Sequence, residues 1–271
     1  MKPAIPFATA ALFALTAIPA AAQPEPERSI ILPGVFPTEV GGTFDARLDY
    51  TDLDDTFLLR NLSVLGLNFF GSYLTPGGFG GYAMLPVGYV SANGGSESAV
   101  GNLEVGGLYV WRKPATHFYL RGGVAVDTAD NDGATIVPLA NFVARPSDAG
   151  PSGLNTNWLR AHGGLRHRVN DLVFGATAGI DFALDRNSED ALLSLSGSIG
   201  IVQPGFSLAG GLTVLALVGD NNPNDDDSTI TLNVTADFGL APSARLYLTL
   251  GANLEDQFHG YSVGLGIRAR L

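Results

Sequence analysis

Basic side chains recur on alternate positions in one short stretch of the chain. Within residues 156–168, three arginines and a histidine share the even positions: Arg160, His162, Arg166 and Arg168. Successive side chains of a β-strand point to opposite faces, so an extended chain would carry all four groups on one face. Guanidinium groups pair with carboxylates and attract anions. In a membrane-spanning sheet, an arginine facing lipid costs about 2–4 kcal/mol at the midplane, so we predict that this face is turned inward.

The same argument assigns further charged residues to the inner face. The basic members are Arg47, Arg112, Arg121, Arg245, Arg268 and Arg270, and the acidic members are Asp45, Asp49, Glu104, Asp127, Asp181 and Asp237. Nine residues are our candidates for lining a path through the interior, namely Arg47, Glu104, Arg121, Arg160, His162, Asp181, Asp237, Arg245 and Arg268.

Two ion pairs are expected within this set. Asp237 and Arg245 are equidistant from residue 241 and should face each other across a turn, while Asp45 should meet Arg268 or Arg270 where the last strand closes on the first. In a hydrated interior each such pair contributes about 0–1 kcal/mol to stability, so one interpretation is that they only stabilise the barrel wall. Alternatively, the same charges select among solutes.

The residues that a hydrolytic enzyme needs do not gather at one place in the sequence. The histidines are His117, His162, His167 and His259. Ser262 lies three residues from His259, but no third group is in place to orient the pair. The chain has no cysteine, and the run from Asn224 to Asp227 lacks the glycine and terminal glutamate of an EF-hand loop. We therefore expect no catalytic residue, no cofactor and no metal site.

Large apolar residues alternate with small or polar ones through most of the chain after Gly42, as is typical of β-strands. The runs with this period are residues 43–50, 79–90, 101–112, 117–127, 156–168, 172–184, 191–202, 206–218, 229–238, 245–252 and 261–271. A further run, 57–70, is apolar but irregular. The pattern predicts about twelve strands, each long enough to cross a membrane.

The connections between these runs alternate between short and long. The short ones, residues 113–116, 169–171, 203–205 and 240–243, contain Pro, Gly, Asn or Ser, whereas the long ones are residues 51–56, 91–100, 128–154, 185–190, 219–227 and 254–260. A soluble periplasmic β-protein, the alternative fold, has no reason for such alternation, but an outer-membrane barrel has short periplasmic turns and long outer loops. We predict an all-β fold, an antiparallel up-and-down transmembrane β-barrel over residues 42–271.

The six long connections carry 16 acidic residues against two arginines, Arg145 and Arg186, which predicts an acidic outer rim. Such a rim either concentrates cations at the mouth or is simply solvated and bridges divalent ions to anionic lipopolysaccharide. The formal net charge of -11 and a pI near 4.6 argue against nucleic acid as a partner.

The N-terminal residues predict export. Lys2, an apolar stretch from Ala4 to Ala17 and the small residues before Gln23 are typical of a Sec signal peptide, residues 1–22, cleaved between Ala22 and Gln23. We expect the mature chain to lie in the outer membrane, with outer-membrane lipid, lipopolysaccharide, the barrel assembly machinery and small solutes as partners. Residues 23–41 are expected to be a periplasmic lead-in whose apolar part, Ile30–Val35, either docks on the barrel or forms a tail.

Three stretches resemble a known family. The run Leu85–Tyr89, a glycine-rich loop and the run Gly101–Arg112 are similar to the strand-loop-strand signature of the porin-like transporter family associated with meta-pathway degradation of phenols, and Gly260–Leu271 is similar to its last strand. Asn102 stands where that family often has Asp. The resemblance implies passive uptake of small, often apolar or aromatic solutes, and no binding residue is carried over from it.

The sequence therefore favours a narrow passive channel for small solutes. The alternative is a closed structural or receptor barrel, with the lumen filled by large inward side chains, by Ile30–Val35 or by the 128–154 connection. A lipid-active outer-membrane hydrolase is the least favoured hypothesis.

Overall fold

The computed structural model describes residues 30–53, 62–92, 95–129, 133–152, 156–184, 191–218, 228–254 and 260–271. The predicted signal peptide lies outside these ranges. The strands are β1 (Gly41–Leu53), β2 (Leu62–Leu74), β3 (Phe79–Ala92), β4 (Gly95–Val100), β5 (Leu103–Lys113), β6 (Thr116–Val126), β7 (Trp158–Val169), β8 (Leu172–Ala183), β9 (Ala191–Gln203), β10 (Phe206–Val218), β11 (Ser228–Ala241), β12 (Ala244–Asn253) and β13 (Gly260–Arg270). Two helices, α2 (Gly133–Ala144) and α3 (Pro146–Ser152), separate β6 from β7.

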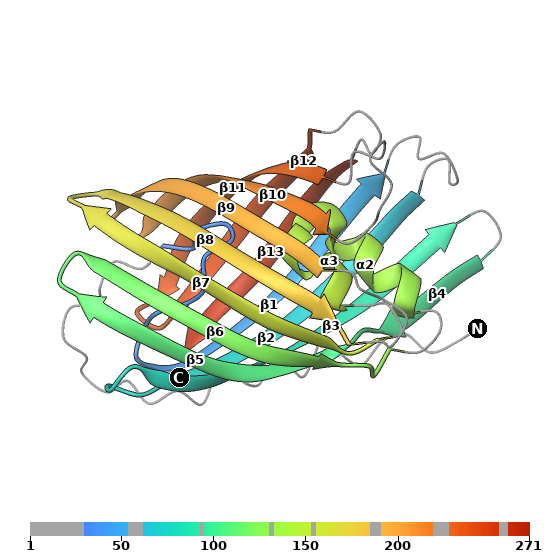
Figure 1. Ribbon diagram of the computed structural model, residues 1–271. Coiled ribbons are helices and arrows are strands. Elements are labelled where there is room, and N and C mark those ends of the chain that lie inside the picture. The colour runs from blue at the N-terminus through green and yellow to red at the C-terminus, as the bar shows by residue number, and fades with distance from the viewer. Residues whose placement is uncertain are drawn as a thin grey trace.

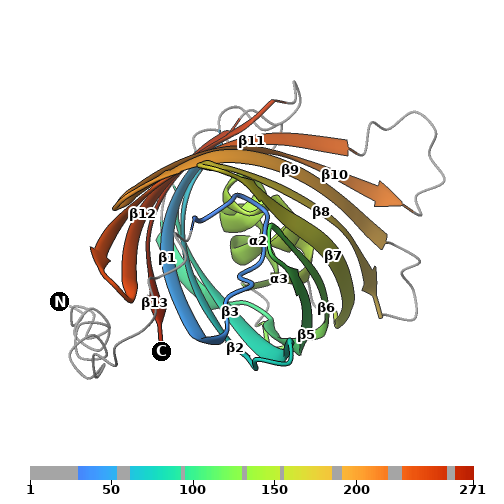
Figure 2. The ribbon, with the colours of Figure 1, turned by 90° about the vertical axis from the view of Figure 1, so that its left-hand side faces the viewer.

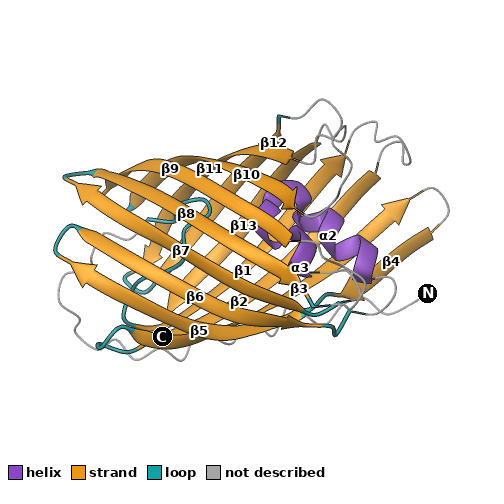
Figure 3. Cartoon of the chain, viewed as in Figure 1, coloured by secondary structure: helices purple, strands orange, loops and turns teal. Residues whose placement is uncertain are grey.

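Twelve of the strands form a closed antiparallel barrel (Figures 1 and 3). Neighbours in the chain pair with each other, and β1 pairs with β13 from Thr43↔Arg270 to Leu53↔Gly260, which closes the cylinder. The thirteenth strand, β4, pairs only with the part of β3 nearest the long loops, beyond the segment that pairs with β5. Closure gives each of the twelve barrel strands two partners, as a sheet in lipid requires, and among the described strands β4 alone has one. The predicted transmembrane β-barrel of about twelve strands is confirmed.

The two faces of the wall divide as the alternation predicts. In β7, Arg160 is 1% exposed, whereas its neighbour Leu159 is 46% exposed on the outer surface. Large apolar side chains such as Leu195, Leu250 and Leu265 cover the outside on other strands. Polar and charged side chains are instead buried inside. An apolar exterior and a polar interior are what a lipid-embedded barrel requires.

One predicted strand has different bounds, and one was missed. The irregular run 57–70 corresponds to β2, Leu62–Leu74, while residues 57–61 lie outside the described ranges. Its alternation is blurred because two inward residues, Val64 and Phe70, are apolar and pack against material inside the barrel. The 91–100 connection, expected to be a loop, contains β4.

The barrel is occupied from both ends. Residues 30–40, here called the inner segment, lie inside the end that carries the short turns, and helices α2 and α3 lie inside the end that carries the long loops (Figure 2). The sequence offers Ile30–Val35 and the 128–154 connection as segments that could fill the lumen. The described parts of both lie inside it. Neither described helix is long and apolar enough to cross a membrane.

Candidate functional site: the barrel interior

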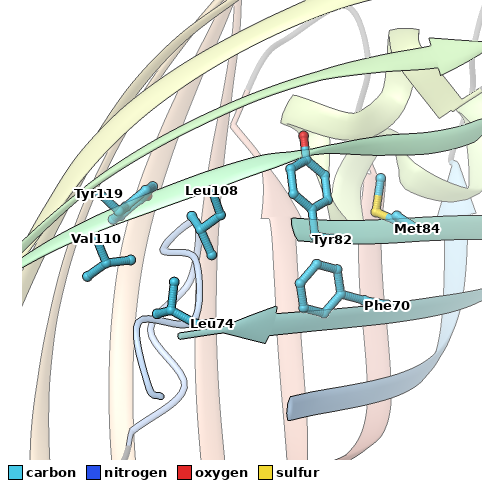
Figure 4. Close-up of a cluster of buried hydrophobic side chains, with 7 residues drawn as sticks. All are labelled: Phe70, Leu74, Tyr82, Met84, Leu108, Val110 and Tyr119. Carbon is cyan, nitrogen blue, oxygen red and sulfur yellow. The ribbon is translucent and has the colours of Figure 1, made fainter. Parts of the chain in front are cut away.

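The inner segment is anchored by apolar contacts with the wall. Ile30 and Leu32 pack with Val173, Val202 and Ala209 from β8, β9 and β10. On the opposite side, Val35 and Phe36 pack on a cluster drawn in Figure 4, which consists of Phe70, Leu74, Tyr82, Met84, Leu108, Val110 and Tyr119. The ring of Phe36 lies edge-on to that of Phe70, with centroids 5.0 Å apart.

Polar contacts fix the same segment along its length. The Ile31 amide donates to Asp237 Oδ2 at 3.3 Å, and Thr177 Oγ1 donates to the Gly34 carbonyl at 2.9 Å. Gly34 has φ of 72°, a left-handed conformation that suits glycine and lets the chain turn inside the barrel. Near the short-turn end, Arg112 Nη2 donates to the Thr38 carbonyl at 3.1 Å and Arg166 pairs with Glu39. The contacts are specific, so the segment has a defined seat in the lumen.

Helix α2 occupies the loop end of the lumen. Its side chains Ile136 and Val143 pack on Val64 of β2 and Ala99 of β4, and Asn68 Nδ2 donates to Asn141 Oδ1 at 3.2 Å. These contacts bury the apolar face of the helix against the wall. The sequence pattern predicts a long polar connection over 128–154, so this helix is not expected from it.

Arg160 is the centre of a buried ion cluster that joins the wall to α3. Its Nε lies 3.0 Å from Asp181 Oδ1 of β8, its Nη1 lies 3.0 Å from Asp148 Oδ1 of α3, and the same Nη1 pairs with Glu104 of β5. His162 Nε2 contacts Asp181 Oδ1 at 2.7 Å. Three carboxylates thus converge on one guanidinium that has no exposed surface.

Asp148 ties α3 to this cluster. Burial alone would raise the pKa of the Asp148 carboxyl, but the charges of Arg145, Arg160 and Arg121 together hold that pKa well below its ordinary value. Arg145 Nη2 lies 2.6 Å from Asp148 Oδ2. The carboxylate therefore stays ionised at neutral pH and holds the helix against the wall.

A second set of ion pairs lies toward the short-turn end and the closing seam. Arg268 Nε lies 2.7 Å from Asp45 Oδ2 across the β1–β13 seam, and Asp237 pairs with Arg245 across the β11–β12 turn. Both expected ion pairs form, but only Asp45 and Arg268 lie directly opposite each other; Asp237 lies opposite Tyr247 and reaches Arg245 diagonally, because the register shifts near the turn. Arg47 Nε also lies 2.6 Å from Asp49 Oδ1 within β1.

A cavity of about 160 Å³ remains between the inner segment and the helices. We call it the chamber. Residues Ile31–Pro37 form one side and Ala144–Asp148 another, and four arginines, Arg47, Arg121, Arg145 and Arg268, reach it. A further side, here called the hydroxyl wall, consists of Ser194, Ser196, Thr213, Asn233, Thr235 and Thr249 on the inner face of β9–β12.

All nine candidate residues have inward positions, but they do not share one place. Arg47, Arg121, His162 and Arg268 line the chamber. Glu104, Arg160 and Asp181 belong to the buried cluster beside it, and Asp237 and Arg245 pair near the short turns. Whether any of them lines a permeation path stays a prediction.

Two expectations from the sequence need correction. Asp127, expected inside, is exposed just beyond the end of β6, because the strand stops at Val126. Asp148 and Arg145, counted with the outer loops, are drawn into the lumen by α3. Most other acidic residues of the predicted rim lie outside the described ranges.

The sequence reasoning missed the hydroxyl wall. Its signal is present in β9, where Ser194, Ser196 and Ser198 occupy the parity opposite to Leu193, Leu195 and Ile199. Small neutral side chains carry no strong penalty on the lipid-facing side, so their parity marks the inner face less clearly than that of charged residues. These small side chains are important because they leave space in the lumen, whereas the arginines on other strands fill it.

Two solved structures with a similar fold are an outer-membrane channel and a porin. An outer membrane channel from Pseudomonas putida F1 is similar with a TM-score of 0.62 at 17% identity, covering 89% of this chain and 100% of that one. The KdgM porin is similar with a TM-score of 0.54 at 13% identity, covering 84% of this chain and 99% of that one. No family model and no curated protein matches the chain. At these identities the comparisons establish the fold, that of a transmembrane barrel.

Proposed function

We propose that the protein is an outer-membrane channel that passes small solutes through a narrow lumen. The observation that carries the proposal is the chamber, a polar, charge-lined cavity of about 160 Å³ inside the barrel. An eight-stranded barrel is filled by its own side chains, whereas twelve strands enclose more space than inward side chains alone fill. Outer-membrane channels with the same fold support this reading.

Passage through this lumen is restricted at two levels. The inner segment narrows the short-turn end and α2–α3 narrow the loop end, so the chamber lies between two constrictions. Passive diffusion of small solutes is therefore proposed, with low conductance. The same proposal includes Sec export, short turns on the periplasmic side, contact with lipopolysaccharide and insertion by the barrel assembly machinery. These parts rest on the sequence pattern.

A closed structural or receptor barrel is the second candidate, and one observation favours it. The inner segment makes specific hydrogen bonds and apolar contacts at several points. A segment seated in this way could seal the lumen permanently.

Single-channel recording in planar bilayers separates the two. The channel proposal predicts resolved conductance steps from the folded native protein, and Arg121→Glu should shift the reversal potential toward cation selectivity because it reverses a charge in the chamber. Arg168→Glu, at the short-turn end of β7 and outside the chamber lining, is the matched control and should shift it less. Folded protein without conductance steps would favour the closed barrel.

A further inference from the structure

Of the four arginines that reach the chamber, Arg121 has the weakest pairing with a carboxylate. Its Nη2 lies 3.8 Å from Asp148 Oδ1, which is too long for a hydrogen bond, and that oxygen already accepts from Arg160 at 3.0 Å. In the described part of the chain, this is its nearest recorded carboxylate contact. The other three arginines at the chamber each have a closer carboxylate: Arg47 has Asp49, Arg145 has Asp148 and Arg268 has Asp45.

The position of Arg121 makes this incomplete pairing significant. Its side chain is only 10% exposed, and its guanidinium lies 5.1 Å from the ring centroid of Phe36 and 5.7 Å from that of Tyr82. The rings hold the guanidinium in place and take none of its in-plane N–H donors. Buried cations are normally paired. An anionic group entering the chamber would complete the pairing of Arg121.

The hydroxyl wall offers a different chemistry to the same cavity. Ser196 Oγ and Thr213 Oγ1 are 3.0 Å apart, and Thr235 Oγ1 and Thr249 Oγ1 are 3.2 Å apart. Each hydroxyl has one donor and two acceptor sites, so the Thr235–Thr249 pair leaves capacity for a ligand, whereas Ser196 and Thr213 lie against Gly34 of the inner segment. The amide oxygen of Asn233 is buried without a hydrogen-bond partner among the described residues. This wall suits a neutral polyhydroxylated group.

The size of the chamber limits the occupant. A cavity of about 150 Å³ holds a six-carbon ring such as benzene, and the chamber measures about 160 Å³. By this comparison the chamber holds about six non-hydrogen atoms, which is enough for a carboxylate on Arg121 and the adjacent hydroxyl-bearing carbons on the hydroxyl wall.

We propose that the chamber is a binding site for small hydroxy carboxylates, in which Arg121 binds the carboxylate and the hydroxyl wall binds the hydroxyl groups. The inference rests on the proposed function, since it names the class of solute that the channel takes. The site recognises both features together, so neither a neutral polyol nor a plain fatty acid of the same length binds as tightly.

Isothermal titration calorimetry on the folded protein in detergent tests this with three matched six-carbon probes. D-gluconate carries carboxylate and hydroxyls, D-glucitol carries hydroxyls alone, and hexanoate carries carboxylate alone. Gluconate should bind at least tenfold more tightly than either of the others. Equal affinity for gluconate and glucitol, tighter binding of hexanoate, or no gluconate binding would overturn the proposal.

Variants assign the two halves of the site. Arg121→Gln should weaken gluconate binding by about tenfold or more, because it removes the charged partner of the carboxylate. Thr235→Val removes a hydroxyl at nearly constant shape and should weaken gluconate binding severalfold without changing hexanoate binding. If Arg121→Gln does not fold, Arg121→Lys is the alternative variant. It keeps the positive charge and should retain part of the affinity for gluconate. Arg168→Gln is the control, and an effect equal to that of Arg121→Gln would contradict the assignment.

The titration also separates this inference from the proposed function, because it needs no transport. Gluconate binding in a protein without conductance would keep the site and reject the channel. Conductance without gluconate binding would keep the channel and reject the site.

Discussion

Arg160 Nη1 of the wall strand β7 donates to Asp148 Oδ1 of α3 at 3.0 Å. This contact joins a rigid strand to a helix inside the lumen. Because Arg160 also pairs with Glu104 and Asp181, the same guanidinium braces three wall strands and one inserted helix. The position of the helix therefore depends on a charge that also holds the barrel together.

Replacing Arg160 with methionine should destabilise the folded barrel by about 3–5 kcal/mol, because three carboxylates would lose their shared buried cation. Denaturant titration in lipid vesicles measures the free energy of unfolding. Arg168→Met, at the short-turn end of the same strand, is the control and should cost under about 1 kcal/mol. Adding Asp181→Asn to Arg160→Met should recover part of the loss, and a further loss would contradict the cluster.

The docking of α3 should resist mild acid. The pKa of the Asp148 carboxyl lies below its ordinary value in the folded protein, so the ionised form is more stable there than in the unfolded chain. The stabilisation is fully present above the ordinary pKa of about 4 and is lost only as the pH falls through the lower folded value.

Melting temperatures of the native protein and of Asp148→Asn measure this contribution. Their difference should stay constant from pH 8 to about pH 5 and shrink in stronger acid. A difference that already vanishes between pH 8 and pH 6 would show that Asp148 does not carry the low pKa.

An arginine on the outer face should be tolerated only near the membrane surface. Leu265 lies at the middle of β13 and Leu240 near the short-turn end of β11, and both are exposed on the barrel exterior. Leu265→Arg should cost about 2–4 kcal/mol of unfolding free energy in lipid, and Leu240→Arg about 0–1 kcal/mol. Equal costs at the two positions would contradict the assignment of the lipid-facing belt.

The parity of charged residues predicted the wall well. Arg160 and Leu159 take opposite faces as expected, and the Asp45–Arg268 and Asp237–Arg245 ion pairs both form, the second of them diagonally because Asp237 lies opposite Tyr247. The reason is physical: lipid on one side of a strand penalises charge strongly, and register follows once the turns are short.

The contents of the lumen were harder to predict. Residue spacing within a strand says nothing about which loop folds inward, so Asp148 was counted with the rim although it pairs with Arg160. The inner segment is held by contacts such as that between the Ile31 amide and Asp237, which are 206 residues apart in the chain. Such contacts depend on the closed barrel and leave no local pattern in the sequence.

Single-channel conductance before and after removal of residues 30–39 tests the central claim most directly. If this segment narrows a lumen that otherwise conducts, the deletion should raise the conductance severalfold. Leu32→Asp, which places a charge in the apolar seat formed by Val173 and Val202, should raise it in the same direction if the deletion does not fold. A folded barrel whose conductance is unchanged by either alteration would contradict the account.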